Sequence, residues 1–414
     1  MKVKSAIFLA AVILCILFSG VSVYAADSNL DGYDDNDFSK IQAFLNQTST
    51  NGTTSNGAFL NAAYNSADPT TWAGVTWNSD ASKRVTAIDW YENYSLNGNL
   101  DASGFDALTS LQIGANSIDS LSVSGDTALT SLDASSNNLF SLNVTTLSSL
   151  TSLNVRSNSI TSLDVSNNVL LTNLNCSVNR LTALNVASNT ALTALDCRSN
   201  SIASLDLTGL NVLTSLTCSY NDLTALDLST NVSLTTVIVT SNAISTLDVS
   251  GLSGLTTLEC NSNSLSTLDV SANSALDSLS CSGNNLSSID LTNNTALTYL
   301  LCSYNPFGSL SLTANTALQY LYANSCNLSS LDTTTNANLL HLYASDNSLS
   351  AVDVTGNSAL TQLRISDNAL TSISLTNNTS LEYLDLQNNN LTSLSTPASS
   401  SLSTVIASYN QLAS

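Results

Sequence analysis

The sequence predicts a repeat solenoid that is mainly β, and two patterns carry this prediction. From Leu108 onward the chain repeats every 21 residues without an insertion, through fourteen full periods to Leu402 and a shortened fifteenth. In each period positions 1, 4, 6, 11, 14 and 16 are apolar, so one coil has an inside edge that only a neighbouring coil can cover. Residues 108–414 are therefore expected to stack into a rod or arc around one continuous core.

Residues 1–25 predict a secretory signal peptide. Lys2 and Lys4 precede an apolar run from Ala6 to Phe18, and small residues follow around Ala25. An apolar run of this length is short for a bilayer, and the small residues suit a cleavage site. No later segment resembles a membrane span. The mature chain is therefore expected to be secreted or held at the cell surface.

Residues 26–107 do not follow the period and are expected to form a small α/β cap on the N-terminal end of the core. The cap begins with the acidic stretch "DSNLDGYDDNDF", which spaces carboxylates and an amide around Gly32. Calcium loops of the EF-hand and dockerin kinds use such a spacing, although Phe38 stands where their last ligand falls. The alternative is a solvated acidic leader. The candidate calcium ligands are Asp27, Asn29, Asp31, Asp35 and Asp37.

Each period is expected to contain a short strand and two asparagine-lined turns. Positions 3 to 8 alternate, so positions 3, 5 and 7 should face outward from one long parallel sheet. A coil of 21 residues leaves little room for helix, so the return segment "LDVS" should be short and extended. Position 9 is Asn in fourteen of fifteen periods, and its amide can satisfy backbone groups of its own and adjacent coils. A second row of asparagines, one file along the repeats, should satisfy backbone groups at the opposite turn. It includes Asn168, Asn189, Asn273, Asn294, Asn315 and Asn357.

Six cysteines occupy the inward position 6 and are expected to form a buried ladder of free thiols. A metal site needs ligands that converge on one point, which a ladder does not supply. Disulfides between in-register residues of adjacent parallel strands have poor torsional geometry. Cys326 instead stands at position 9, in place of the turn Asn, and is interpreted as scaffold. The ladder consists of Cys176, Cys197, Cys218, Cys260, Cys281 and Cys302.

The repeat L-x-x-L-x-C/V/A/I-x-x-N-x-L/I resembles the leucine-rich repeat family, and the match covers more than 300 residues. The 21-residue length and the cysteine ladder are similar to the internalin J class of bacterial surface adhesins. This resemblance implies attachment to a host or cell partner.

The segment "WAGVTWNSDASKRV" and the residues after it resemble the N-terminal cap of plant-type leucine-rich repeats. Trp77 stands where that family usually has Cys, so no cap disulfide is expected. Trp72, Trp77 and Trp90 are expected in the core of the cap. The matching landmarks are Trp72, Gly74, Val75, Arg84, Val85 and Gly98.

The outward positions 3 and 5 change character along the repeats. They are small or polar in most periods up to Ser280, and aromatic or charged residues follow. Tyrosine and arginine are enriched in binding hot spots because they bury much area and keep a polar group. The alternative is that these tyrosines only reflect strand preference. The candidate ligand-binding residues are Tyr299, Leu301, Tyr320, Tyr322, His341, Tyr343, Arg364 and Tyr383.

Composition and motifs exclude several function classes. A net charge of −21 with no basic patch argues against nucleic acid and anionic lipid as partners. The single His and the lack of a nucleophile with a base predict no catalytic residue and no enzyme. We expect an adhesin-like protein that binds an extracellular protein or glycan. One alternative is a structural protein whose copies associate end to end through the uncapped last repeat. A remote alternative is an ice-binding solenoid that uses the threonine file at position 17, which runs through Thr292, Thr313, Thr334, Thr355 and Thr376.

Overall fold

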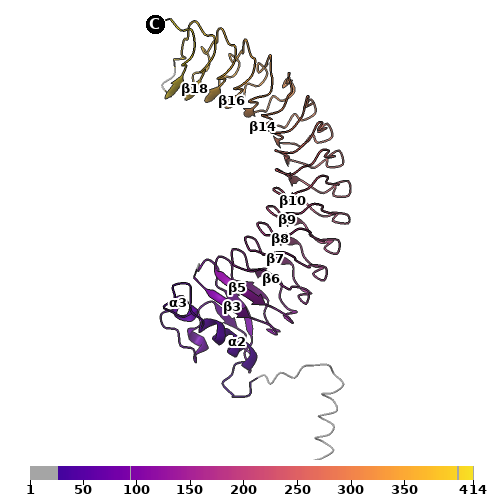
Figure 1. The fold of residues 1–414 in the computed structure, drawn as a ribbon, viewed down its shortest axis with the longest axis vertical. Helices are drawn as coiled ribbons and strands as arrows, with labels where there is room; N and C mark the ends of the chain where they lie inside the picture. The colour runs from indigo at the N-terminus through magenta and orange to yellow at the C-terminus, as the bar shows by residue number, and fades with distance from the viewer. Residues whose placement is uncertain (1–26, 94, 399–400, 414) are drawn as a thin grey trace, which may run out of the picture. The chain divides into compact units, whose positions relative to one another are not determined.

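The computed structural model describes residues 27–93, 95–398 and 401–413, so the predicted signal peptide lies outside the described residues. The chain divides into two compact units, Met1–Leu150 and Thr151–Ser414. Figure 1 shows the path of the chain through them. Among the described residues, no helix has the length and apolar character needed to cross a membrane.

Among the described residues of the first unit, two α-helices and a short 3₁₀ helix come first. These are α2 (Asp35–Leu45), α3 (Asn56–Leu60) and η1 (Pro69–Thr71). Helix α2 starts where it does because the Asp34 carboxylate accepts the free N–H groups of Asn36 and Asp37. Its apolar face is buried, and the ring of Phe44 stacks on Trp90 with centroids 5.1 Å apart. This contact joins the helix to the strands that follow.

The strands of the first unit fall into two groups by their pairing. Strand β1 pairs antiparallel with β2, β2 and β6 both pair in parallel with β4, and β3 pairs with β5 separately. Trp72 and Trp90 are buried between these elements, as predicted, and the indole of Trp90 donates to the Ala73 carbonyl at 2.8 Å. Trp77 is only half-buried. The strands are β1 (Val75–Trp77), β2 (Val85–Asp89), β3 (Asn97–Asp101), β4 (Ser110–Gln112), β5 (Ser117–Ser122) and β6 (Ser131–Asp133).

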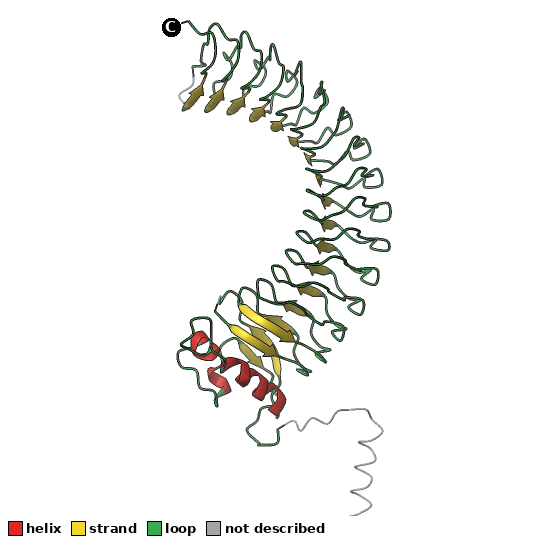
Figure 2. Ribbon diagram, viewed as in Figure 1, coloured by secondary structure: helices red, strands yellow, loops and turns green. Residues whose placement is uncertain are grey.

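The second unit is a parallel sheet of short strands, one from each coil. Each strand residue before the last strand pairs with the residue 21 positions further along, so the predicted period and sheet are confirmed. Figure 2 shows that loops make up the rest of each coil. The strands are β7 (Ser152–Asn154), β8 (Asn173–Asn175), β9 (Ala194–Asp196), β10 (Ser215–Thr217), β11 (Thr236–Ile238), β12 (Thr257–Glu259), β13 (Ser278–Ser280), β14 (Tyr299–Leu301), β15 (Tyr320–Tyr322), β16 (His341–Tyr343), β17 (Gln362–Arg364), β18 (Tyr383–Asp385) and β19 (Thr404–Ile406).

The inward positions form the core of the repeats. In the coil that starts at Leu255, all six inward side chains are at most 6% exposed. Complete burial of one such side chain contributes roughly 1.5–3 kcal/mol, so each coil depends on its neighbours for most of its stability. The ladder cysteines at position 6 are all buried and free, which agrees with the prediction of packed thiols.

Both predicted asparagine files bond the backbone of neighbouring coils. At position 9, the Asn221 amide donates to the carbonyls of Cys197 and Cys218 at 3.1 and 3.0 Å, and its oxygen accepts from Ile202 N at 3.0 Å. At the opposite turn, Asn189 donates to the carbonyls of Val165 and Asn168 at 3.0 and 2.9 Å. These side chains replace the regular backbone bonds that a tight turn cannot make.

The return side of the coils is organised by turns rather than by a second long ladder. Within the described residues, regular pairing on this side is limited to β3 with β5 and a bridge between Asp332 and Asp353. The aspartates at position 15 accept from the residue two places on. For example, Asp332 accepts from both the N–H and the hydroxyl of Thr334, at 2.9 and 2.6 Å. The aspartate and threonine files therefore have a structural explanation.

Candidate binding face

The eight predicted ligand-binding residues lie on consecutive strands β14 to β18 of the second unit. Strand alternation turns positions 3 and 5 away from the core, and all eight side chains are half-buried. Register pairs Tyr299 with Tyr320, and Tyr322 with Tyr343. We call this group the aromatic patch, and it consists of Tyr299, Leu301, Tyr320, Tyr322, His341, Tyr343, Arg364 and Tyr383.

The rings of the aromatic patch pack against one another. Tyr299 lies 6.0 Å from Tyr320 and 5.5 Å from Tyr322, measured between ring centroids. Tyr320 meets His341 at 5.0 Å, and Tyr322 meets Tyr343 at 4.8 Å, both with an interplanar angle of 88°. Edge-to-face contact is a favoured arrangement for aromatic quadrupoles. The rings thus form one packed surface rather than isolated side chains.

Arg364 lies between two tyrosines at one side of the aromatic patch. Its guanidinium carbon is 4.6 Å from the ring centroid of Tyr343 and 4.3 Å from that of Tyr383. A cation over an aromatic face is attracted by the ring, and a stacked guanidinium keeps its N–H groups in its own plane. Its Nε is buried and has no hydrogen-bond partner among the described residues. The patch therefore contains a charged donor that is held in place.

Hydrogen bonds fix two of the rings further. The hydroxyl of Tyr322 lies 3.3 Å from His341 Nδ1, and the hydroxyl of Tyr343 donates to the side-chain oxygen of Gln362. Burial, and then the charge of Arg364, lowers the pKa of His341, so its ring is neutral near pH 7 and can accept from Tyr322. Gln362 was not among the predicted residues, although it occupies the same outward position 3 as His341.

The sheet surface of the earlier strands differs from the aromatic patch. Between β7 and β10 it forms an open hollow of about 360 Å³ with small polar side chains. The charged residue that lines this hollow is Asp196, whose carboxylate lies 3.4 Å from Nε of Arg198. This hollow was not predicted from the sequence, because small side chains at outward positions do not indicate a binding site. It offers hydroxyl and amide groups but no aromatic ring.

Exposed tyrosines at position 8 also escaped prediction, namely Tyr220, Tyr304 and Tyr409. Tyr304 follows β14 at position 8, is 64% exposed and has a φ of 60°. The backbone at position 8 has a positive φ in the neighbouring coils as well, as at Ser325 and Asp346. The aromatic side chain is therefore not needed for the turn, and it adds exposed apolar area next to the strand that carries Tyr299.

The predicted calcium ligands do not all gather in one loop. Asp27 accepts from the N–H groups of Asp31 and Gly32, at 3.1 and 2.9 Å. Asn29 accepts from Asp31 N at 2.9 Å, and Asp35 accepts from Ser28 N at 2.8 Å. These bonds fold the segment into a turn with carboxylate and amide oxygens around it. Within the described residues, however, no three His, Cys, Asp or Glu side chains are grouped as metal ligands would be.

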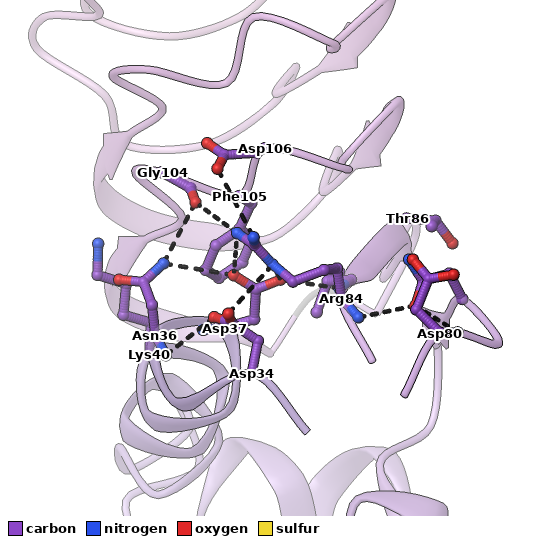
Figure 3. Close-up of polar contacts among 12 residues, drawn as sticks. Asp34, Asn36, Asp37, Lys40, Asp80, Arg84, Thr86, Gly104, Phe105 and Asp106 are labelled. Atoms are coloured by element: carbon purple, nitrogen blue, oxygen red, sulfur yellow. Dashed lines mark hydrogen bonds and ion pairs between the residues drawn. The ribbon is translucent and has the colours of Figure 1, made fainter. Parts of the chain in front are cut away.

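Asp37 does not lie where a calcium ligand was predicted. Its carboxylate is fully buried on α2, where it accepts from Arg84 Nε at 3.1 Å and from Val85 N at 2.9 Å. Figure 3 shows Arg84 between Asp37 and Gly104, whose carbonyl also accepts from it at 3.1 Å. Burial raises the pKa of Asp37, and its bonds to Arg84 and Val85 oppose that rise. The residue is a structural ion-pair partner, so a calcium site here would rest on Asp27, Asn29, Asp31 and Asp35.

The short parallel strands, the 21-residue register and the asparagine-lined turns define a leucine-rich repeat protein. No protein-family model and no curated protein matches this sequence. Among solved structures, internalin J of Listeria monocytogenes, whose functional domain includes a cysteine ladder, is 37% identical. That match has a TM-score of 0.71 and covers 73% of this chain and 68% of the other. The chain belongs to the internalin J-like leucine-rich repeat proteins.

Two further structures share the fold. YopM from Yersinia enterocolitica matches 75% of this chain and 69% of its own, with 25% identity and a TM-score of 0.64. Internalin F of Listeria monocytogenes matches 62% of this chain and 80% of its own, with 21% identity and a TM-score of 0.57. These similarities support the solenoid architecture, and the aromatic patch is described from this chain's own residues.

Proposed function

We propose that this chain is a secreted or cell-surface, adhesin-like leucine-rich repeat protein that binds a partner protein through the aromatic patch. The observation that carries the proposal is the packed group of tyrosines with Arg364 on five neighbouring strands of an open sheet. Such residues contribute most to protein interfaces because they bury large areas and lose little side-chain freedom. The family resemblance and the predicted signal peptide support a partner outside the cell.

A protein partner fits this face better than a glycan. Sugar rings stack on flat aromatic faces, whereas several rings here stand edge to face with a neighbour and so share their faces within the patch. Mutual packing and the hydrogen bonds of Tyr322 and Tyr343 hold the surface in one conformation. A preorganised surface loses less side-chain entropy on binding.

The proposal is tested with labelled protein and intact cells. Saturable binding to a panel of cultured cell surfaces is measured before and after treatment of the cells with protease or with glycosidases. Truncation of a hot-spot tyrosine costs about 2 kcal/mol or more, so Tyr320→Ala combined with Tyr322→Ala should weaken binding by at least about 30-fold. We expect binding that protease treatment of the cells abolishes.

A matched control uses the same two positions on β10. Ser215→Ala combined with Thr217→Ala should leave the affinity unchanged, because this strand lies outside the aromatic patch. Equal affinity of the tyrosine variant and the wild type would overturn the patch as the binding site. Binding that survives protease but not glycosidases would favour the glycan alternative.

A further inference from the structure

Arg364 is the cation of the aromatic patch, and it has no carboxylate partner of its own. Elsewhere, Arg84 Nε lies 3.1 Å from Asp37 Oδ2, and Arg198 Nε lies 3.4 Å from Asp196 Oδ2. In the part of the chain that the structure describes, no ion pair involves Arg364. The chain has 30 acidic residues and nine basic ones, so a shortage of carboxylates does not explain this.

The carboxylates closest to Arg364 along the repeats are bonded elsewhere. Asp385 on β18 is the register partner of Arg364 on β17. One oxygen of Asp385 accepts from Gln387 N at 3.0 Å. Asp367, three residues after Arg364, accepts from the side-chain amide of Asn388 at 2.6 Å. These acids take part in the turns of their own coils and leave the guanidinium without a counter-ion.

The guanidinium of Arg364 is held between two rings with its terminal nitrogens accessible. Its central carbon lies 4.6 Å from the ring centroid of Tyr343 and 4.3 Å from that of Tyr383. Nε is buried and lacks an acceptor among the described residues, whereas Nη1 and Nη2 are not covered in this way. A guanidinium carries its donors in a planar fork. The two terminal nitrogens are therefore available to an acceptor from another molecule.

We propose that the partner protein presents an aspartate or glutamate carboxylate to Arg364, and that this charge pair positions the partner on the aromatic patch. The inference rests on the proposed function, because it names a group that the partner carries. The two terminal nitrogens match the two oxygens of a carboxylate in a bidentate pair. One guanidinium balances one negative charge, so a carboxylate fits better than a phosphate with nearly two.

The charge of the rest of the molecule makes such a pair selective. A net charge of −21 repels an acidic partner over most of the surface, and Arg364 offers attraction at one place on the patch. Its Nε is already out of contact with water, and a charge pair formed in a water-poor interface is stronger than one in bulk water. Complementary charges fix the register of a complex. The carboxylate should therefore decide where the partner docks, while the tyrosines supply most of the buried area.

The test compares saturable binding of the labelled chain to native cells and to cells whose surface carboxylates have been converted to amides with a carbodiimide and glycinamide. Amidation removes negative charge from the cell, so bulk electrostatics predicts tighter binding of a chain with a net charge of −21. We expect the opposite, a loss of at least about 10-fold for the wild type. Arg364→Gln should weaken binding to native cells by a similar factor and lose no further affinity on amidation.

A matched control and a second enzyme treatment complete the design. Arg156→Gln removes the same charge from an exposed side chain outside the aromatic patch and should bind as the wild type does. Sialidase treatment of the cells should leave wild-type binding unchanged. A loss after sialidase would assign the carboxylate to a glycan and overturn the inference. Because amidation acts on the cells, the wild-type comparison decides the question even if Arg364→Gln folds poorly.

Failure of this inference can be told apart from failure of the proposed function. Undiminished binding of Arg364→Gln, or an equal loss on amidation for that variant and the wild type, would refute the carboxylate pair. If Tyr320→Ala combined with Tyr322→Ala still abolished binding in that case, the aromatic patch would stand as the binding site without the pair. Absence of saturable wild-type binding to every cell surface would refute both.

Discussion

Replacing Asp126 with asparagine should stabilise the first unit, with a gain that appears above about pH 4 and is complete above about pH 7. Asp126 occupies position 19, where nine of the later repeats have Asn. One of its oxygens accepts from Phe105 N at 2.9 Å, but Oδ2 is buried without a hydrogen-bond partner among the described residues. Burial raises the pKa of Asp126 from 3.8 to about 7, although bonds from Phe105 and Gly104 oppose that rise. The folded protein therefore holds a carboxyl that resists ionisation.

The size and sign of the effect follow from this shift. A rise of roughly 3 pKa units corresponds to about 4 kcal/mol between the two protonation states. Because the folded pKa is above the unfolded one, the stabilising contribution is complete below about pH 4 and is lost as the pH rises through about 7. Asn carries no charge, and its amide can donate to backbone carbonyls as Asn189 does. At pH 8 the variant should gain up to about 4 kcal/mol.

Urea unfolding followed by tryptophan fluorescence measures this difference. All three tryptophans lie in the first unit, so the signal reports the part of the chain that contains Asp126. Asp119→Asn, which removes an exposed charge from the same unit, is the matched control and should not change the pH dependence. If wild type and Asp126→Asn differ by the same amount at pH 4 and pH 8, the buried-carboxylate reasoning is wrong.

Three further predictions concern other parts of the chain. Arg84→Met leaves the buried Asp37 without its ion-pair partner and should cost about 3–5 kcal/mol of unfolding free energy, measured by the same fluorescence assay. Asn221→Ala removes the acceptor of Ile202 N and should cost roughly 1–3 kcal/mol in denaturant titrations followed by circular dichroism, whereas Asn211→Ala on an exposed site should be neutral. Calcium, if it binds around Asp31, should raise the melting temperature relative to chelator, and Asp31→Ala should abolish that rise while Asp80→Ala does not.

The repeat architecture could be predicted from the sequence because the same physical constraint acts on the same position of every coil. Position 9, for instance, needs a side chain that both donates and accepts, and the contacts of Asn221 show why. Asp37 could not be placed in this way. Its partner Arg84 lies 47 residues away in a segment without repeats, and one spacing pattern cannot distinguish a loop ligand from a capped helix residue.

The candidate site could be predicted in composition but not in geometry. The outward periodicity correctly put Tyr320 and Tyr322 on one face, yet the ring angles and the bond from Tyr343 to Gln362 depend on side-chain rotamers. Cys326 offers a different lesson. Its position number already placed it one coil beyond Cys302, but only the structure shows that its thiol takes the place of the asparagine amide at the Cys302 carbonyl.

The fold itself does not require the aromatic patch. Ser215 and Thr217 on β10 occupy the same outward positions as Tyr320 and Tyr322 on β15, and both strands keep the same parallel register with their neighbours. The inward leucines of the two strands, Leu216 and Leu321, are equally buried. Since one backbone accepts either kind of side chain at these positions, the packing of the core does not explain why aromatic residues gather on β14 to β18. A requirement at the surface, which we propose is the binding of a partner, accounts for them.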